Sequence, residues 1–285
     1  MKSHEPTTQF TLWRSDHLLN IDFASYNLVR HSFSRHFHDH YVVEFVLSGI
    51  DNFYCSGRNY TAYNDQLVLI NPGEVHTGST LADMPLRYLS LYPDQDAIDR
   101  IASLLHLPIA HDFHFRDHVV HQPGLSAKFL RLFVTLETKG DPLEQEEIFF
   151  DCMNSLLQST SRINKVPKEA PGSDTRVNRL IEFIRANFRD EISLQQMSEL
   201  VNLNAFHLVR LFKKKVGVSP YDYLLILRAE YAKKLLRQGY KVHDAASLAG
   251  FYDTSHLNRS LRKIAATSPK SFLSSKSQFR TKFND

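Results

Sequence analysis

Three histidines and one glutamate in the first third of the chain have types and spacing that suit a shared site. His36 and His38 are two residues apart, so on a β-strand both imidazoles point to the same face. Glu44 has the same strand parity, and His76 follows an Asn-Pro-Gly turn. Neutral imidazoles with a carboxylate suit iron, manganese or zinc, and they also hydrogen-bond small organic molecules. The alternative for each histidine is a local hydrogen bond within the fold.

A second set of residues, between 205 and 215, suits contact with nucleic acid. Leu208, Leu211 and Phe212 would form one buried stripe on a helix. The other stripe contains the four residues predicted to face DNA, which are Phe206, Val209, Arg210 and Lys213. Arginine makes bidentate hydrogen bonds to guanine, apolar side chains contact the thymine methyl group, and lysine binds phosphate. The alternative for Phe206 is a place in the hydrophobic core.

Short strands must position the histidines. Strand-like runs such as 41–47 and 66–70 end at turn residues, and several of them lie between Phe33 and about His76. This spacing predicts a small β-sandwich or barrel. Apolar residues then recur every three or four positions at 94–107 and 125–158, which predicts amphipathic helices.

Short helices must position the second set. Residues 159–175 contain two prolines, a glycine and mostly polar side chains, so we interpret them as a linker. Behind it, Ser193, Asn204 and Ser219 each precede a helical pattern and are good N-caps. The two short helices that meet near 202–204 form a helix-turn-helix, and a second pair follows at 242–249 and 254–263. We call 205–215 the first reader helix and 254–263 the second. Ser268-Pro269 predicts the start of one more helix.

Charge divides the chain at this linker. Residues 1–175 carry 14 basic and 22 acidic side chains, whereas residues 176–285 carry 20 basic and 9 acidic ones. Lysines and arginines that neutralise phosphates release counterions, so the second half suits a polyanion. DNA, RNA and anionic lipid all satisfy this charge criterion.

The bulk composition describes an ordinary globular protein. Its 285 residues are 42% hydrophobic and 23% charged, which predicts two packed domains. Cys55 and Cys152 belong to no C-x-x-C pair, so we expect no disulfide framework. The first residues lack an apolar core of signal-peptide length, and no run of about 18 apolar residues occurs. We therefore expect a soluble, cytoplasmic protein that does not bind membranes.

The stretch from Ser193 to Phe272 resembles the DNA-binding domain of the AraC/XylS family of transcription regulators. The residues that carry the resemblance are Arg210-Leu211-Phe212-Lys213, Gly217-Val218-Ser219-Pro220, Arg228, Ala232, Leu235-Leu236, Ala249-Gly250-Phe251-Tyr252-Asp253 and Ser268-Pro269. The resemblance implies two reader helices, roughly 34 Å apart, in successive major grooves. It places base-facing positions on Phe206, Val209 and Arg210 in the first reader helix and on Thr254, Ser255, Asn258 and Arg259 in the second. The remaining predicted DNA-binding residues are Lys213 and Lys263.

The second reader helix departs from the family pattern. Leu257 and Leu261 stand where the family usually has phenylalanine, and Ala266 stands where it often has glycine. In the turn of the first helix-turn-helix, Asn202 replaces a frequent glycine, and asparagine tolerates left-handed backbone. We expect a smaller core around the second reader helix. Specificity would then come mainly from the first, with the second adding affinity and register.

The segment from Thr11 to about His121 resembles the cupin fold and, more narrowly, the AraC-type ligand-binding domain. That resemblance implies a small organic effector held by His36, His38, Glu44 and His76, with neither metal nor cofactor. It also implies a homodimer formed by the helices at 125–158, whose apolar stripes are wide. Since 12 of the 15 histidines precede the linker, a pH sensor is an alternative.

The predicted fold class is therefore two-domain. Residues 1–158 form an all-β cupin-like barrel with flanking dimerisation helices, and 159–175 form the linker. Residues 176–276 form an all-α domain with two helix-turn-helix motifs, followed by a tail at 277–285.

The predicted function is sequence-specific transcription regulation, with promoter DNA, a small-molecule effector and RNA polymerase as partners, and no enzymatic activity. One rival is a metal-dependent cupin enzyme that carries a DNA-binding tail. The other is a DNA-repair alkyl transferase, which needs a zinc-held cysteine cluster that two isolated cysteines do not supply.

Overall fold

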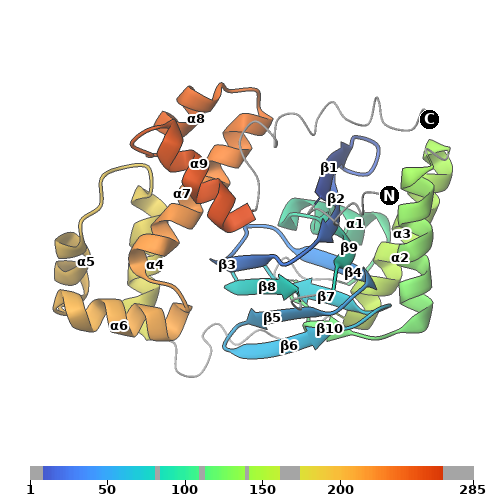
Figure 1. Cartoon of the computed structure of the whole chain (residues 1–285), viewed down its shortest axis with the longest axis horizontal. Coiled ribbons are helices and arrows are strands. Elements are labelled where there is room, and N and C mark those ends of the chain that lie inside the picture. The colour runs from blue at the N-terminus through green and yellow to red at the C-terminus, as the bar shows by residue number, and fades with distance from the viewer. Residues whose placement is uncertain (1–8, 81–83, 109–112, 139–140, 161–173, 266–285) are drawn as a thin grey trace, which may run out of the picture.

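The computed structural model describes residues 9–80, 84–108, 113–138, 141–160 and 174–265, with only the backbone described at 263–265 (Figure 1). Its β-strands all lie in the N-terminal domain. They are β1 (Gln9–Ser15), β2 (Ile21–Leu28), β3 (Ser32–His36), β4 (Val42–Ser48), β5 (Asp51–Cys55), β6 (Arg58–Ala62), β7 (Leu67–Ile70), β8 (His76–Thr80), β9 (Leu86–Tyr92) and β10 (Val119–Val120). The strands between Phe33 and His76 confirm the sequence prediction, whereas β1, β2, β9 and β10 were not predicted.

The strands form two antiparallel sheets. The larger sheet has the order β1-β2-β9-β4-β7-β10, and the smaller sheet has the order β3-β8-β5-β6. Within the described residues, neither β1 nor β10 pairs with a strand of the smaller sheet. The predicted barrel is therefore an open structure of two sheets with side chains packed between them, because its edge strands do not close the circle.

Strand β4 shows how this domain divides its core. Val43 and Phe45 belong to the cluster that packs under the helices, whereas Val42 and Val46 belong to the cluster between the sheets. Alternation along the strand then directs Glu44 toward the space between the sheets. A strand with both faces buried has a nearly continuous apolar sequence, as residues 41–47 do.

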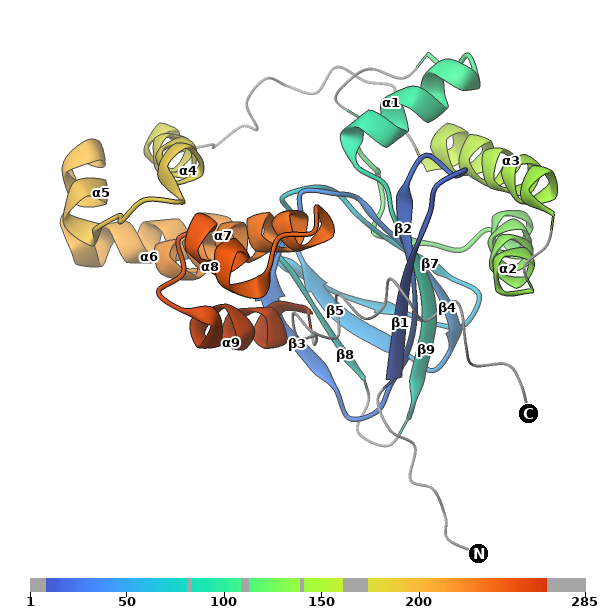
Figure 2. The same cartoon turned by 90° about the horizontal axis from the view of Figure 1, so that it is seen from above.

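Three helices complete the N-terminal domain, namely α1 (Gln95–Leu104), α2 (Pro123–Glu137) and α3 (Pro142–Thr160). Both predicted amphipathic regions are thus helical. The α2 and α3 stripes are buried in the same core as β4 residues Val43 and Phe45. Helices α2 and α3 lie on the side of the sheets that is away from the C-terminal helices (Figures 1 and 2). Much of the apolar stripe assigned to dimerisation is therefore buried within one chain.

The C-terminal domain contains the helices α4 (Thr175–Asn187), α5 (Leu194–Val201), α6 (Ala205–Val216), α7 (Pro220–Arg237), α8 (Val242–Leu248) and α9 (Thr254–Ala265). Ser193, Asn204 and Ser219 each accept a hydrogen bond from a backbone N–H in the first turn, which confirms three predicted caps. Asn202 has φ = 50°, the left-handed backbone expected there. Residues 161–173 of the linker, the helix predicted at Ser268-Pro269 and the tail at 277–285 lie outside the described residues.

The helices in the described ranges all fall short of the length and apolarity that a membrane span requires. Their apolar side chains instead form the cores described above. Leu257 and Leu261, which stand where the family usually has phenylalanine, are fully buried. They join Phe251, Ala246 of α8 and the α8 C-cap Ala249 in the core of the helical domain.

Replacing Leu261 by alanine should lower the free energy of unfolding by about 2 to 5 kcal/mol, because it leaves a cavity in a fully packed site. Urea unfolding of the full chain, followed by circular dichroism, measures this change. Leu248→Ala is the matched control, since Leu248 is 47% exposed and its loss should cost less than about 0.5 kcal/mol. Equal effects of the two substitutions would refute a leucine-filled core around the second reader helix.

Candidate functional site

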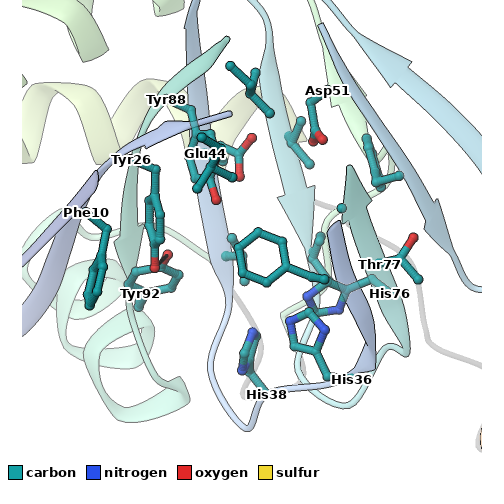
Figure 3. A pocket seen from close by; sticks show the side chains of 18 of the residues that line it. Phe10, Tyr26, His36, His38, Glu44, Asp51, His76, Thr77, Tyr88 and Tyr92 are labelled. Carbon is teal, nitrogen blue, oxygen red and sulfur yellow. Dashed lines mark hydrogen bonds between the residues drawn. The ribbon is translucent and has the colours of Figure 1, made fainter. Parts of the chain in front are cut away.

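A pocket of ≈ 120 Å³ lies between the two sheets (Figure 3). Lys233 and Arg237 of α7, in the helical domain, contribute to its wall. All four residues predicted to bind an effector line this pocket: His36, His38, Glu44 and His76. Figure 3 shows that they do not form one group. The three histidines lie together at one end, and Glu44 lies with Asp51 at the other.

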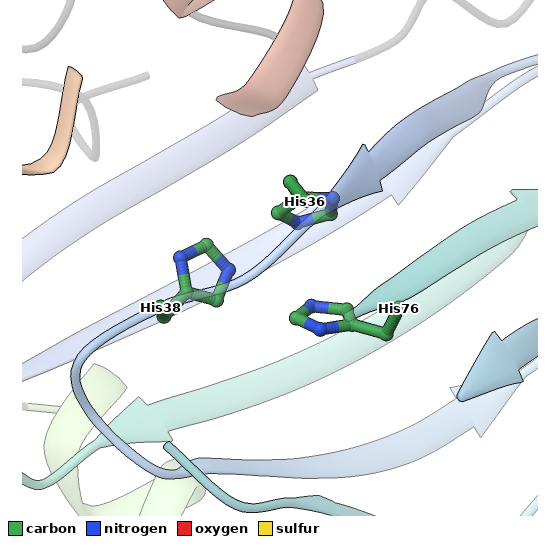
Figure 4. Close-up of side chains that lie close together, drawn as sticks. All are labelled: His36, His38 and His76. Atoms are coloured by element: carbon green, nitrogen blue, oxygen red, sulfur yellow. The ribbon is translucent and has the colours of Figure 1, made fainter. Parts of the chain in front are cut away.

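The histidine cluster, His36, His38 and His76, is held by strand pairing and backbone hydrogen bonds. His36 and His76 are directly opposite each other where β3 pairs with β8. His36 Nδ1 lies 2.7 Å from the Ser34 carbonyl oxygen, and His76 Nδ1 lies 2.8 Å from the Glu74 carbonyl oxygen. One ring nitrogen from each of the three histidines lies within 4.8 Å of the other two (Figure 4).

Burial determines the charge of this cluster. Burial and the neighbouring His38 lower the pKa of His76 to about 3. Burial, His76 and His38 together lower the pKa of His36 well below its ordinary value. Both rings are therefore neutral at physiological pH, so each has one nitrogen with a free lone pair that can bind a ligand or a metal ion.

The carboxyl end of the pocket comprises Glu44 and Asp51. Glu44 sits in the middle of the larger sheet, opposite Val68 and Ser90, which explains its separation from the histidines of the smaller sheet. Burial and the nearby Asp51 raise the pKa of Glu44 well above its ordinary value. Within the described residues, Glu44 Oε1 is buried without a hydrogen-bond partner. Such an atom can accept a hydrogen bond from a bound molecule.

Sequence reasoning missed the aromatic wall of the pocket. Tyr26 and Tyr88 stack with ring centroids 4.6 Å apart, and the hydroxyls of Tyr26 and Tyr92 lie 3.3 Å apart. These tyrosines come from β2 and β9. The alternation of Tyr88, Ser90 and Tyr92 with leucines was the available signal for β9. Nothing in the sequence pattern indicated that Lys233 and Arg237 of α7 also line the pocket.

The segment that carries the histidines also joins the two domains. Phe37, between His36 and His38, is fully buried in the core of the helical domain, with its ring 4.7 Å from that of Tyr223. Arg35 Nη1 donates a 2.7 Å hydrogen bond to the Gly217 carbonyl oxygen.

Two contacts place α7 itself against the N-terminal domain. His38 Nδ1 lies 3.3 Å from Glu230 Oε1, and Arg237 pairs with Asp22 at 2.6 Å. Contacts along the whole of α7 therefore hold the helical domain over the pocket.

The first reader helix, in α6, exposes three of its four predicted side chains, Phe206, Arg210 and Lys213. Phe206 is 64% exposed, so its alternative place in the core is wrong. The Arg210 guanidinium lies over the Phe206 ring at 5.3 Å, and Lys213 is exposed. Val209 is half-buried and packs against the helical core. An exposed arginine beside an aromatic ring can contact a base edge and its neighbouring methyl group.

The second reader helix, in α9, is more covered. Ser255 and Arg259 are exposed, whereas Thr254 and Asn258 are half-buried. The side chain of Lys263 lies outside the described residues. Helix α9 runs beside β3 of the N-terminal domain (Figure 2). The two reader helices therefore differ in exposure as well as in sequence.

Comparison with known proteins identifies the family. A model described as an AraC-like ligand binding domain matches residues 18–153, and a model described as a helix-turn-helix domain matches residues 197–275. The uncharacterized HTH-type transcriptional regulator YbfI of Bacillus subtilis (strain 168) is 30% identical over 243 residues, covering 84% of this chain and 86% of YbfI. The chain belongs to the AraC family of transcription regulators. It is a DNA-binding regulator with an N-terminal ligand-binding domain.

Two further comparisons also span most of this AraC-type regulator. The HTH-type transcriptional activator RhaS of Citrobacter koseri is 26% identical over 251 residues, covering 85% of this chain and 88% of RhaS. The solved structure of unsaturated fatty acid bound wild-type ToxT from Vibrio cholerae strain SCE256 has a TM-score of 0.55 at 13% identity. It covers 97% of this chain and 98% of ToxT. At that identity the likeness concerns the fold.

The carboxyl end of the pocket makes the stability of this AraC-type regulator depend on pH. Burial raises the pKa of Asp51 from 3.8 to about 7. Between these values the unfolded chain ionises Asp51 while the folded chain keeps it protonated, so stability falls as the pH rises. Asp51→Asn should therefore gain more stability over the wild type at about pH 8 than at about pH 4.

Urea unfolding at a series of pH values measures this difference, with Asp65→Asn at an exposed site as the matched control. If Asp51→Asn and the wild type have the same pH dependence, Asp51 does not titrate as a buried carboxyl.

Proposed function

We propose that this regulator binds promoter DNA through α6 and α9, and that a small molecule in the pocket controls this binding. Its effector would contact His36, His38, Glu44 and His76, with the tyrosine wall against its apolar face. Bound at a promoter, the protein would recruit or exclude RNA polymerase. It would do so in the cytoplasm, where a bacterial-type regulator meets the chromosome.

One observation carries this proposal: α7 lines the pocket and also packs against the first reader helix. Tyr223 at the start of α7 packs edge-on against Phe212 of α6, with ring centroids 5.6 Å apart. Near the end of the same helix, Lys233 and Arg237 line the pocket. A ligand that contacts this end of α7 therefore acts on the element that supports the first reader helix. A ligand controls a conformational equilibrium only if it contacts the two conformations differently, and contact with α7 would provide such a difference.

Arg210→Ala should cost about 1 to 3 kcal/mol of binding free energy and relax the preference at one base pair. Lys213→Ala should weaken binding to all sequences alike and reduce the salt dependence, because lysine contacts phosphate. Selection of bound DNA from a random pool, followed by titration of single-base variants, measures both effects. Arg58→Ala, exposed on β6, is the control and should change neither affinity nor preference. An unchanged base preference in Arg210→Ala would show that the proposed reading face is wrong.

We propose that the pocket binds its ligand without catalysis, as in a regulator. The relatives that match most of the chain are named as transcriptional regulators. The raised pKa values of the two cysteine thiols also argue against the alkyl-transferase alternative. Burial and Glu74 raise the pKa of the Cys55 thiol to about 12, and burial raises that of Cys152 as well. A thiol that stays protonated is a poor acceptor for alkyl transfer.

A homodimer through α2 and α3 is also part of the proposal. Although most of their apolar residues are buried within the chain, Leu130 and Val134 are 43% and 49% exposed and one helical turn apart. Leu143 on α3 is 64% exposed. This surface lies away from the helical domain, so pairing there leaves both reader helices free (Figure 2).

The double substitution Leu130→Glu and Val134→Glu should convert the dimer into a monomer, because it places two charges in an apolar interface. Analytical ultracentrifugation of the full chain measures the oligomeric state. Leu104→Glu provides the control, since Leu104 is 60% exposed on α1, outside the proposed interface. A double variant that stays dimeric would place the interface elsewhere.

A further inference from the structure

The three histidines of the cluster are arranged like the ligands of a metal ion, which binding of an organic effector alone does not require. We propose that His36, His38 and His76 bind one divalent transition-metal ion through their Nε2 atoms, and that Glu230 of α7 strengthens this binding through His38. The inference deepens the proposed effector pocket, on which it rests, by naming a metal ion as part of what the pocket holds. It also ties the ion to the docking of the helical domain.

The tautomers of two histidines are already those of metal ligands. The carbonyl oxygens of Ser34 and Glu74 only accept hydrogen bonds, so Nδ1 of His36 and of His76 must donate to them. Each ring then presents the lone pair of Nε2 to the cluster. Metal-binding histidines typically donate their second ring nitrogen to a carbonyl or carboxylate in this way, which fixes the ring orientation.

The third histidine has the same arrangement with a carboxylate. His38 Nδ1 lies 3.3 Å from Glu230 Oε1, which leaves Nε2 of His38 for the ion. Glu230 Oε1 also lies 2.6 Å from Lys233 Nζ, an ion pair in which the carboxylate offsets the lysine charge near the cluster. A carboxylate only accepts hydrogen bonds, so His38 Nδ1 donates to it.

The spacing of the three rings suits a single ion. Their centroids are 4.3 to 5.2 Å apart, and one nitrogen from each lies within 4.8 Å of the others. A tetrahedral zinc ion with Zn–N distances of about 2.0 Å separates its ligand nitrogens by about 3.3 Å. Small rotations of the imidazoles close that difference. Glu44 is outside this set, so the fourth position is left to solvent or to the effector.

The ion would be coupled to the arrangement of the domains. A metal on Nε2 makes the His38 N–H more acidic, and its hydrogen bond to Glu230 becomes stronger. Because Glu230 belongs to the helical domain, the bound ion favours the docked arrangement, and docking in turn favours the ion. Phe37 lies between two of the ligands and is packed in the helical core. Separation of the domains would therefore also displace the backbone of His36 and His38.

Titration of the chelator-treated full chain with ZnCl₂ in a calorimeter tests the proposal, with elemental analysis for stoichiometry and cobalt substitution for the absorption spectrum of the site. We expect one ion per chain and its loss in His38→Ala and in His76→Ala. Glu230→Gln preserves side-chain volume and should keep the stoichiometry while weakening zinc binding about 10- to 100-fold. Glu182→Gln, an exposed exchange on α4, is the matched control and should bind zinc like the wild type.

A second control excludes the other group of metal-binding side chains in the described residues, Cys55, Glu74 and His118. Cys55→Ser should leave zinc stoichiometry and affinity unchanged. Absence of zinc binding, or its persistence in both histidine variants with native circular dichroism, would overturn the metal site. Unchanged affinity in Glu230→Gln would overturn the coupling. Since the titration contains no DNA, these failures are distinct from failure of the DNA-binding function.

Discussion

Insertion of Phe37 into the helical domain is the contact on which the arrangement of this regulator depends. The side chain comes from the N-terminal domain, yet it is buried in the core formed by α4 to α9. Its neighbours on either side, His36 and His38, face the pocket instead. Three consecutive residues thus connect the ligand-binding space, the domain interface and the core behind the first reader helix. A shift in any one of these three places must move the others, because they share one stretch of backbone.

Helix α7 is the element of the helical domain that contacts this segment. It packs against Phe37 through Tyr223, against His38 through Glu230, and against Asp22 through Arg237. These contacts include an apolar stack, a buried histidine–carboxylate contact and a partly exposed ion pair. A surface of mixed character resembles interfaces that open and close more than a permanent core, since its charged members regain water on separation. That character suits a protein in which a ligand changes the presentation of the DNA-binding domain.

Burial gives the pocket two chemically different ends. At one end it keeps His36 and His76 neutral, and at the other it favours the protonated forms of Glu44 and Asp51. The same physical cause, loss of hydration of the charged form, thus produces lone-pair donors at one end and hydroxyl donors at the other. The tyrosine wall between them is apolar on its ring faces. The pocket therefore offers a ligand hydrogen-bonding groups at both ends and apolar ring faces between them.

Local features of the sequence were enough to predict the helical domain. The caps at Ser193, Asn204 and Ser219 and the left-handed Asn202 depend on residues within a few positions of one another, so a local pattern contains all the information. The same holds for the exposed face of α6. The inward orientation of Glu44 also followed from strand parity alone.

Tertiary structure decided the composition of the pocket and its connection to DNA binding. Glu44 lies in a different sheet from His36 and His76, and strands β2 and β9, far apart in sequence, supplied the tyrosines. Docking of α7 added Lys233 and Arg237, and it turned Phe37 into a member of the other domain's core. Such facts depend on pairing between distant segments. Hydrophobic period and capping depend only on the residues of one segment. The reader helices could therefore be predicted from the sequence, whereas the link between the pocket and the reader helices could not.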